Sequence, residues 1–143
     1  MKRIGLFLLA VVMVAGLAGC TDSDDDSAVD TCALADFVGT WKGNISGSVG
    51  SDTVTLPWML ILADAGGKLS GEWISKNNGR GDAQAVVAGC GAVFTLQSPG
   101  CSSGWSPTSA MTLTAAPNTA EWVMSGNLCG LVTTLTGTLT KSP

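Results

Sequence analysis

The sequence has no histidine and no tyrosine, and only 13% of its 143 residues are charged. Histidine is the commonest general base near neutral pH, so its absence excludes Ser-His-Asp and Cys-His catalytic arrangements. The chain also has no Cys-x-x-Cys pair, a spacing that is typical of zinc sites. We therefore expect a protein that is not an enzyme and that has neither a metal nor a cofactor.

The acidic residues do not form a catalytic pair in the sequence pattern either. Glu72 falls on the polar face of an alternating segment, and Asp64 and Asp82 come at turns. Glu121 lies close to another turn at Asn118. A glycosidase-type pair needs two carboxyls on either side of a cleft, and no spacing here predicts one. These carboxylates are typical of a solvated surface.

Basic residues are also few. From Thr31 onward there are five basic and six acidic residues, so this part of the chain is nearly neutral. Nucleic-acid binding needs a basic patch, which these residues do not form. The basic residues are Lys42, Lys68, Lys76, Arg80 and Lys141, and the acidic residues are Asp36, Asp52, Asp64, Glu72, Asp82 and Glu121.

The N-terminus has the layout of an export signal. Lys2 and Arg3 precede an uncharged, largely apolar run that continues to Gly19. The alternative is a membrane span, but a span needs about 20 apolar residues and this run is shorter. The run ends in the letters LAGC at 17–20, which resemble the lipobox of bacterial lipoproteins at all four positions.

The lipobox resemblance implies a lipid anchor. Residues 1–19 are then a signal peptide that is cleaved between Gly19 and Cys20, and Cys20 carries a diacylglyceryl thioether and an amide-linked acyl chain such as palmitate. Two or three acyl chains anchor a protein firmly to a membrane. Asp after the lipid-bearing cysteine retains enteric-type lipoproteins in the inner membrane. Because Thr21 stands there, the resemblance implies the outer membrane, with the domain facing the periplasm or the surface.

Residues 21–31 contain five aspartates and one large apolar side chain, Val29. Such a segment cannot bury enough surface to fold, so we expect a flexible acidic tether. The stretch also resembles the surface-export signals of some Gram-negative lipoproteins, but a plain tether is the preferred interpretation. The chain is thus divided into a signal peptide (1–19), the lipidated cysteine with its tether (20–31) and one domain (32–143).

The domain is predicted to be all-β. Residues 68–76 place Leu69 and Trp73 on one face and Glu72 on the other, as a half-buried strand does. No segment predicts a helix. Eight strands joined by short turns favour an antiparallel up-and-down barrel, with a two-sheet β-sandwich as the alternative. The strands are expected at 37–46, 52–63, 67–76, 82–88, 91–98, 109–115, 120–128 and 131–140.

The first expected strand contains Gly39 and Trp41 in a Gly-x-Trp motif. This motif resembles the start of the calycin barrels, which include the lipocalins and the avidins. Residues 65–73 are similar to the second hairpin of avidin-like proteins. The resemblance implies a small barrel of the kind that binds ligands inside it. Small periplasmic or lipid-anchored protease inhibitors also open with a Gly-x-Trp strand and carry a disulfide, an analogy of fold and compartment only.

Biotin binding does not carry over from the avidins. The tyrosine that a biotin site has on its third strand is absent, because the chain has none. Trp73 and Ser75 lie near that position, and Asn44 or Ser48 are the residues that would supply polar contacts from the first strand. This set does not make a biotin site.

The cysteines predict disulfides in an oxidising compartment. With Cys20 lipidated, four cysteines remain, which allow three pairings. In an up-and-down barrel, Cys32 and Cys90 would lie at one end and Cys101 and Cys129 at the other. We therefore expect Cys32 to pair with Cys90 and Cys101 with Cys129.

Five tryptophans are the main candidates for function. Trp41 is expected to plug the closed end of the barrel, and Trp58, Trp73 and Trp122 to fill its core. Trp105 lies in the longest predicted loop (99–108), where it either packs locally or contacts a partner.

These features favour two classes of function. The first is a small-molecule binding module, and the second is a protein-interaction module such as an envelope protease inhibitor or a structural envelope protein. A cavity lined by Trp58, Trp73 or Trp122 would indicate a ligand. A packed barrel with an exposed Trp105 loop would indicate a protein partner.

Overall fold

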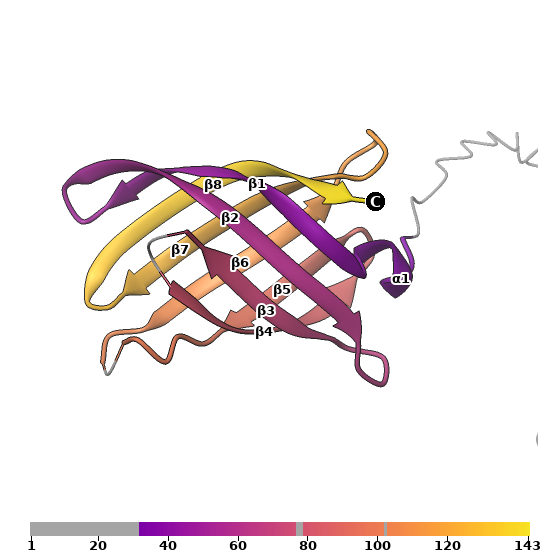
Figure 1. The fold of residues 1–143 in the computed structure, drawn as a ribbon, viewed down its shortest axis with the longest axis horizontal. Helices are drawn as coiled ribbons and strands as arrows, with labels where there is room; N and C mark the ends of the chain where they lie inside the picture. The colour runs from indigo at the N-terminus through magenta and orange to yellow at the C-terminus, as the bar shows by residue number, and fades with distance from the viewer. Residues whose placement is uncertain (1–31, 77–78, 102) are drawn as a thin grey trace, which may run out of the picture.

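The computed structural model describes residues 32–76, 79–101 and 103–143. The predicted signal peptide, the predicted cleavage site before Cys20 and the predicted tether up to residue 31 lie outside the described residues. Eight antiparallel strands form a closed barrel in which each strand pairs with the next and β8 pairs with β1 (Figure 1). The predicted up-and-down barrel is confirmed, and the sandwich alternative is wrong. The strands are β1 (Gly39–Val49), β2 (Asp52–Asp64), β3 (Leu69–Ser75), β4 (Gly79–Ala88), β5 (Gly91–Leu96), β6 (Ser106–Leu113), β7 (Thr119–Leu128) and β8 (Leu131–Ser142).

Each predicted strand overlaps one observed strand, but the start of the domain differs. β1 begins at Gly39 because the preceding residues form a short helix, α1 (Leu34–Phe37). The backbone N–H of Ala33 donates to Asp36 Oδ2 at 2.7 Å and so caps the start of α1. The expectation of no helix is therefore wrong, because a single turn is too short to produce a helical period in the sequence.

Two other strands, β6 and β4, begin three residues earlier than predicted. β6 begins at Ser106, so the loop before it is shorter and Trp105 directly precedes a strand. β4 begins at Gly79, so Asp82 lies within a strand and not at the predicted turn. Both starts contain glycine or proline, which favour turns, but pairing with the neighbouring strands β7 and β3 extends the sheet through them.

Alternating side chains fill the interior. In β2, Trp58 and Leu60 are buried whereas Ile61 faces outward. The largest fully buried side chains come from α1 and from the inward positions of six strands. They are Trp41, Trp73, Trp122, Phe37, Ile45, Leu60, Leu69, Met111, Met124, Leu135, Leu139 and Thr133.

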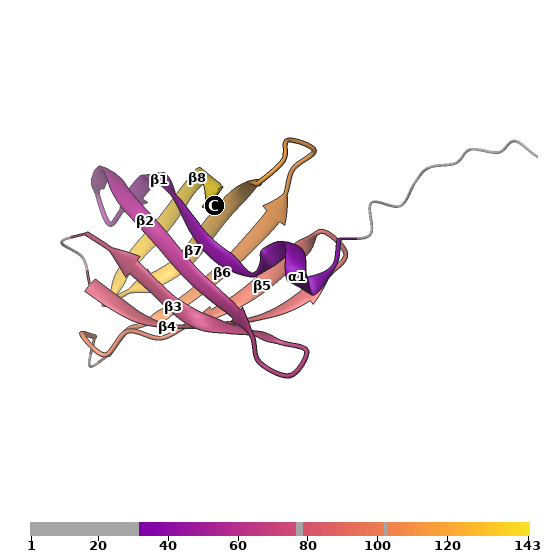
Figure 2. The ribbon, with the colours of Figure 1, turned by 45° about the vertical axis from the view of Figure 1, so that its right-hand side comes forward.

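One disulfide holds each end of the barrel. Cys32 pairs with Cys90 at the end where α1 lies, and Cys101 pairs with Cys129 at the opposite end. The predicted pairing is confirmed. Figures 1 and 2 place α1 beside the start of β1, and in Figure 1 the β1–β2 and β7–β8 turns lie at the other end. We call these the α1 end and the open end.

The α1 end is closed by Phe37 and Trp41, of which 0% and 1% is exposed. The indole Nε1 of Trp41 donates to the Phe37 carbonyl at 2.8 Å. Lys141 lies over the Trp41 ring at 5.6 Å, and its Nζ donates to the Asp36 carbonyl at 3.0 Å. These contacts join α1 to the first and last strands.

Candidate functional site

The open end contains a cavity of about 200 Å³. Its lining comes from β1, β2, β3, β7 and β8 and from the loops at that end. None of the described residues that line it carries a charge. The lining residues are Val49, Leu56, Trp58, Trp73, Ser75, Trp105, Met124, Leu128, Cys129 and Leu131.

Three of the lining residues form a stack of nearly parallel indoles. The Trp58 and Trp73 rings have centroids 5.1 Å apart and planes 8° apart, and Trp73 and Trp105 have centroids 5.4 Å apart and planes 12° apart. Deeper in the barrel, Trp122 packs against Trp58 at 5.8 Å and against Phe94 at 5.0 Å. The stack therefore makes part of the cavity lining aromatic.

The strand register brings this stack together. Trp58 is paired with Ser75 and Leu60 with Trp73, so the two indoles are diagonal neighbours on the inner face of the β2–β3 pair. On the other side, Trp73 is paired with Gly81 of β4. A Cβ at Gly81 would lie only 2.8 Å from the Trp73 Nε1, so the glycine leaves the space that the indole occupies.

The three indole N–H groups of the stack differ in their partners. Trp73 Nε1 donates to the Gln97 carbonyl at 2.8 Å, and Trp105 Nε1 donates to the Leu96 carbonyl at 2.7 Å. Trp58 Nε1 is buried and has no acceptor in the described part of the chain. The first two groups therefore hold the Trp73 and Trp105 side chains in the wall of the cavity.

Trp105 had two interpretations from the sequence, local packing and an exposed partner contact. Its side chain is half-buried, stacks on Trp73 and donates its N–H to Leu96. Local packing is therefore correct, and Trp105 is part of the cavity wall. The disulfide between Cys101 and Cys129 holds the same loop against the β7–β8 turn.

Two polar residues suggested for the site do not lie in it. Asn44 and Ser48 are exposed and stand on the outward face of β1, because Trp41 and Ile45 occupy the inward face. Ser75, by contrast, is 3% exposed and lines the cavity together with Trp73.

Sequence reasoning also missed the apolar rim of the cavity, formed by Val49, Leu56, Met124, Leu128 and Leu131. Their apolar character gave a signal for an inward face. The apolar character of these residues does not indicate at which end of the barrel each side chain lies, because this position depends on the strand register. Trp122, named as a cavity candidate, packs deeper and is not among the lining residues.

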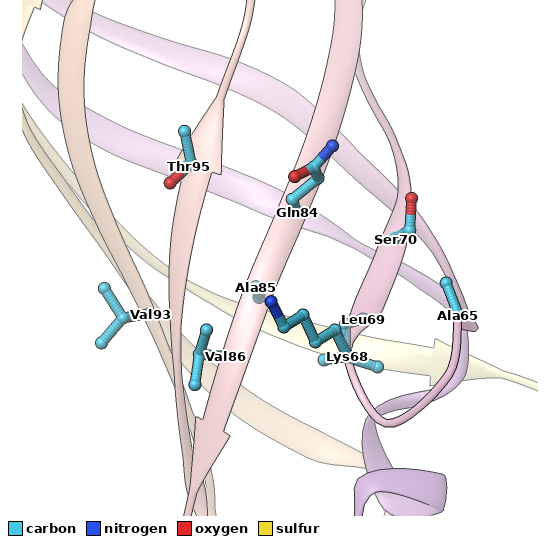
Figure 3. Close-up of a pocket in the computed structure, with 9 residues that line it drawn as sticks. All are labelled: Ala65, Lys68, Leu69, Ser70, Gln84, Ala85, Val86, Val93 and Thr95. Atoms are coloured by element: carbon cyan, nitrogen blue, oxygen red, sulfur yellow. The ribbon is translucent and has the colours of Figure 1, made fainter.

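Pockets also lie on the outside of the barrel, and one of them has a volume of about 290 Å³, larger than the open-end cavity. Figure 3 shows this pocket over β3, β4 and β5, where Lys68 extends from the β2–β3 connection across β4. Val86 and Val93 beside it are 62% and 60% exposed. This surface brings no acid, base or nucleophile together among the described residues, apart from the single amine of Lys68.

The acidic side chains lie on the surface. Glu72 accepts from Arg80 at 3.0 Å in an exposed ion pair, and Asp64 Oδ1 accepts from the backbone N–H of Gly67 at 2.9 Å. Asp82 and Glu121 are exposed on strands.

Residues 32–76, 79–101 and 103–143 contain no group of three or more His, Cys, Asp or Glu that could hold a metal. In the same residues, no helix has the length and hydropathy to cross a membrane.

Comparison with known proteins finds no family model, no curated protein and no solved structure that matches this chain. The geometry of the cavity therefore carries the argument about function.

Proposed function

We propose that this protein is a lipid-anchored lipoprotein of the bacterial envelope whose barrel binds a small, uncharged, largely apolar molecule at its open end. The observation that carries this proposal is the cavity lined by Trp58, Trp73 and Trp105. No catalytic step is proposed, because the lining offers aromatic and aliphatic surface and no acid or base among its described residues.

The size of the cavity limits the ligand. Its volume is about 200 Å³, whereas a cavity of about 150 Å³ lined by aliphatic and aromatic side chains holds benzene. Pockets for drug-sized ligands are larger, at about 300–1,000 Å³. The proposed ligand, or the part of it that enters the barrel, is therefore a single ring with a short substituent, or a short aliphatic end. A charged group is disfavoured, because it would lose its hydration without gaining a partner.

The anchor is proposed from the N-terminus. Lys2, Arg3 and the LAGC letters at 17–20 support cleavage before Cys20 and acylation of its thiol and amine. Two disulfides in the barrel fit an oxidising compartment outside the cytoplasm. Thr21 supports an outer-membrane address, and the acidic tether would hold the barrel close to that membrane through the lipid at Cys20.

Ligand binding is tested with ethylbenzene as the probe. The protein is the mature chain, residues 20–143, with Cys20→Ala. This substitution removes the proposed site of lipidation, so the protein needs no detergent that would compete for the cavity. Leu131 lines the cavity, whereas Val132 is next to it on the outward face of β8 and is 71% exposed. Leu131→Trp should weaken binding by about tenfold or more because the larger ring fills the cavity, and Val132→Trp should leave it unchanged. Absence of binding to the mature chain, or equal effects of the two substitutions, would contradict the proposal.

The anchor is tested by labelling cells with radioactive palmitate. The full-length protein and its Thr21→Ala variant should carry the label and fractionate with membranes. Cys20→Ala should carry none. Label that persists in Cys20→Ala would exclude the proposed site of lipidation.

One observation favours the second candidate, a protein-interaction or inhibitor module. Val86 pairs with Val93 across β4 and β5, and Val93 is joined through Ala110 to Val123 of β7. The three valines are exposed and form an apolar row on the outside of the barrel. A partner from envelope extract that binds the mature chain and Thr134→Lys, but not Val93→Lys, would support this candidate. Binding unaffected by Val93→Lys would reject the row as its interface.

A further inference from the structure

We propose that the acidic segment before the domain folds back onto the outside of the barrel, over β4 and β5. Val29 packs there against Val86 and Val93, and aspartates of the segment lie beside a lysine, Lys68. The occupant of this surface is thus a part of the same chain that lies outside the described residues. The surface is separate from the open-end cavity, so this docking does not depend on the ligand proposed there.

The docking surface is the outer pocket of about 290 Å³ shown in Figure 3. Val86 and Val93 line it and are 62% and 60% exposed, although both are apolar. The two residues are direct partners across β4 and β5, so their side chains lie next to each other on the outer face. Covering them would remove apolar surface from water, which favours docking.

Lys68 gives this surface a positive charge. Its side chain extends across β4 (Figure 3), and none of the described residues that line the pocket is acidic. Asp64, four residues before Lys68, accepts from the backbone N–H of Gly67. Glu72, four residues after it, accepts from Arg80. The amine of Lys68 has no ion pair among the described residues, so a carboxylate from the segment can bind it.

The segment before the domain offers both kinds of contact. Residues 21–31 contain five aspartates and one large apolar side chain, Val29. Asp26 comes three residues before Val29, and Asp30 directly follows it. An apolar surface with one positive charge is thus matched by an anionic segment with one apolar side chain.

The disulfide between Cys32 and Cys90 brings the segment to this surface. The Cα atoms of the two cysteines are 4.8 Å apart, and Cys90 lies in the turn between β4 and β5. Val93 comes three residues after Cys90, and Val29 comes three residues before Cys32. Three extended residues span about 10 Å, so the two valines are within the same reach of the disulfide. Val29 therefore meets Val93 when the segment runs alongside β5.

The covalent link makes a weak contact sufficient. One buried valine and one exposed ion pair each contribute little by themselves. Because the segment belongs to the same chain, its effective concentration at the surface is on the order of millimolar. We therefore expect a docked state in equilibrium with a released one, and salt should favour the released state because it screens the exposed charges.

Docking also affects the apolar row formed by Val86, Val93 and Val123. The segment would cover the first two valines and leave Val123 exposed. An envelope protein that binds this row would have to displace the segment first. The segment would thus compete from within the chain with a partner at this face.

The test uses the mature chain, residues 20–143 with Cys20→Ala, with ¹³C-labelled valine methyl groups. A nuclear Overhauser effect appears only between protons that lie close together. We expect one between the methyl groups of Val29 and those of Val86 or Val93. Absence of this effect would overturn the proposal. Signals of Val86 and Val93 that move with protein concentration would show that a second copy covers the surface, which would overturn it too.

Two charge reversals test the assigned site. Lys68→Glu and Lys42→Glu change the net charge equally, but Lys42 is on the outward face of β1 and does not line this pocket. Lys68→Glu should lower the ratio of docked to released chain, measured from the Overhauser intensity at Val29, by about threefold or more. Lys42→Glu should leave it unchanged. An equal fall in both variants, or no fall in Lys68→Glu, would contradict the proposed contact with Lys68.

Discussion

The same substitution at two buried tryptophans should have clearly different effects on stability. Trp41 and Trp122 are 1% and 0% exposed, and Trp→Phe removes the same atoms from each. At Trp41 the lost N–H donates to the Phe37 carbonyl at 2.8 Å. At Trp122 the lost N–H has no partner among the described residues. The two variants therefore differ mainly in the hydrogen bond that joins β1 to α1, and to a lesser extent in the contact of Lys141 with the Trp41 ring.

Both variants lose packing around a smaller ring, a cost that should be similar in the two. Trp41→Phe additionally leaves a buried carbonyl without its donor, which costs about 1–3 kcal/mol. Trp122→Phe removes a donor that gains nothing from the fold, so this term is absent. We expect Trp41→Phe to lower the free energy of unfolding by about 1–3 kcal/mol more than Trp122→Phe does.

The assay is equilibrium unfolding in urea, followed by far-UV circular dichroism without reductant, because tryptophan fluorescence would change with the substitutions themselves. The slopes of the two transitions should agree, so that the midpoints report stability. Equal losses in the two variants, or a larger loss in Trp122→Phe, would refute the reasoning.

Further predictions concern the disulfides, the pH and the surface ion pair. Removing Cys32 and Cys90, which are separated by 58 residues, should cost about 4 kcal/mol in urea unfolding, and removing Cys101 and Cys129, separated by 28, about 3.5 kcal/mol. Only removal of the second disulfide should also weaken ethylbenzene binding, because Cys129 lines the cavity. A fall in the free energy of unfolding below about 1 kcal/mol on removal of either disulfide would contradict the loop-closure account. The Kd of ethylbenzene should stay constant from about pH 5.5 to 8.5, since the described lining has no charged side chain; a change of more than about twofold in calorimetric titration would reveal an ionisable group at the site. Arg80→Ala should change the free energy of unfolding by less than about 1 kcal/mol, because its ion pair with Glu72 is exposed; a larger loss would mean that the pair has a role beyond the surface.

Much of the barrel could be predicted from the sequence. The alternation around Trp58 and Trp73 has the period of a strand, and turn residues separate eight such segments. Once the strands are counted, an up-and-down topology determines which connections share an end of the barrel. The disulfide pairing follows from that count, because Cys32 and Cys90 fall at one end and Cys101 and Cys129 at the other.

Other features of the fold and the site depend on contacts that no local sequence pattern indicates. Helix α1 is a single turn, and its cap at Asp36 and its contact with Trp41 become visible only in three dimensions. The stacking of Trp105 on Trp73 joins a loop to a strand, at a register that the sequence does not specify. The outward position of Asn44 and Ser48, by contrast, could have been predicted from the sequence. Side chains alternate between the two faces of a strand, and both residues are an odd number of positions from Trp41, which points inward.

The central claim is that the open end of the barrel binds a small uncharged molecule, and the indole N–H signals test it most directly. The chain has five tryptophans, so the mature chain should give five indole ¹H–¹⁵N signals. Titration with ethylbenzene should shift the signals of Trp58, Trp73 and Trp105, which line the cavity, and leave Trp41 at the α1 end unmoved. No shift up to the solubility limit of the probe, or equal shifts of Trp41 and the three cavity tryptophans, would contradict the account.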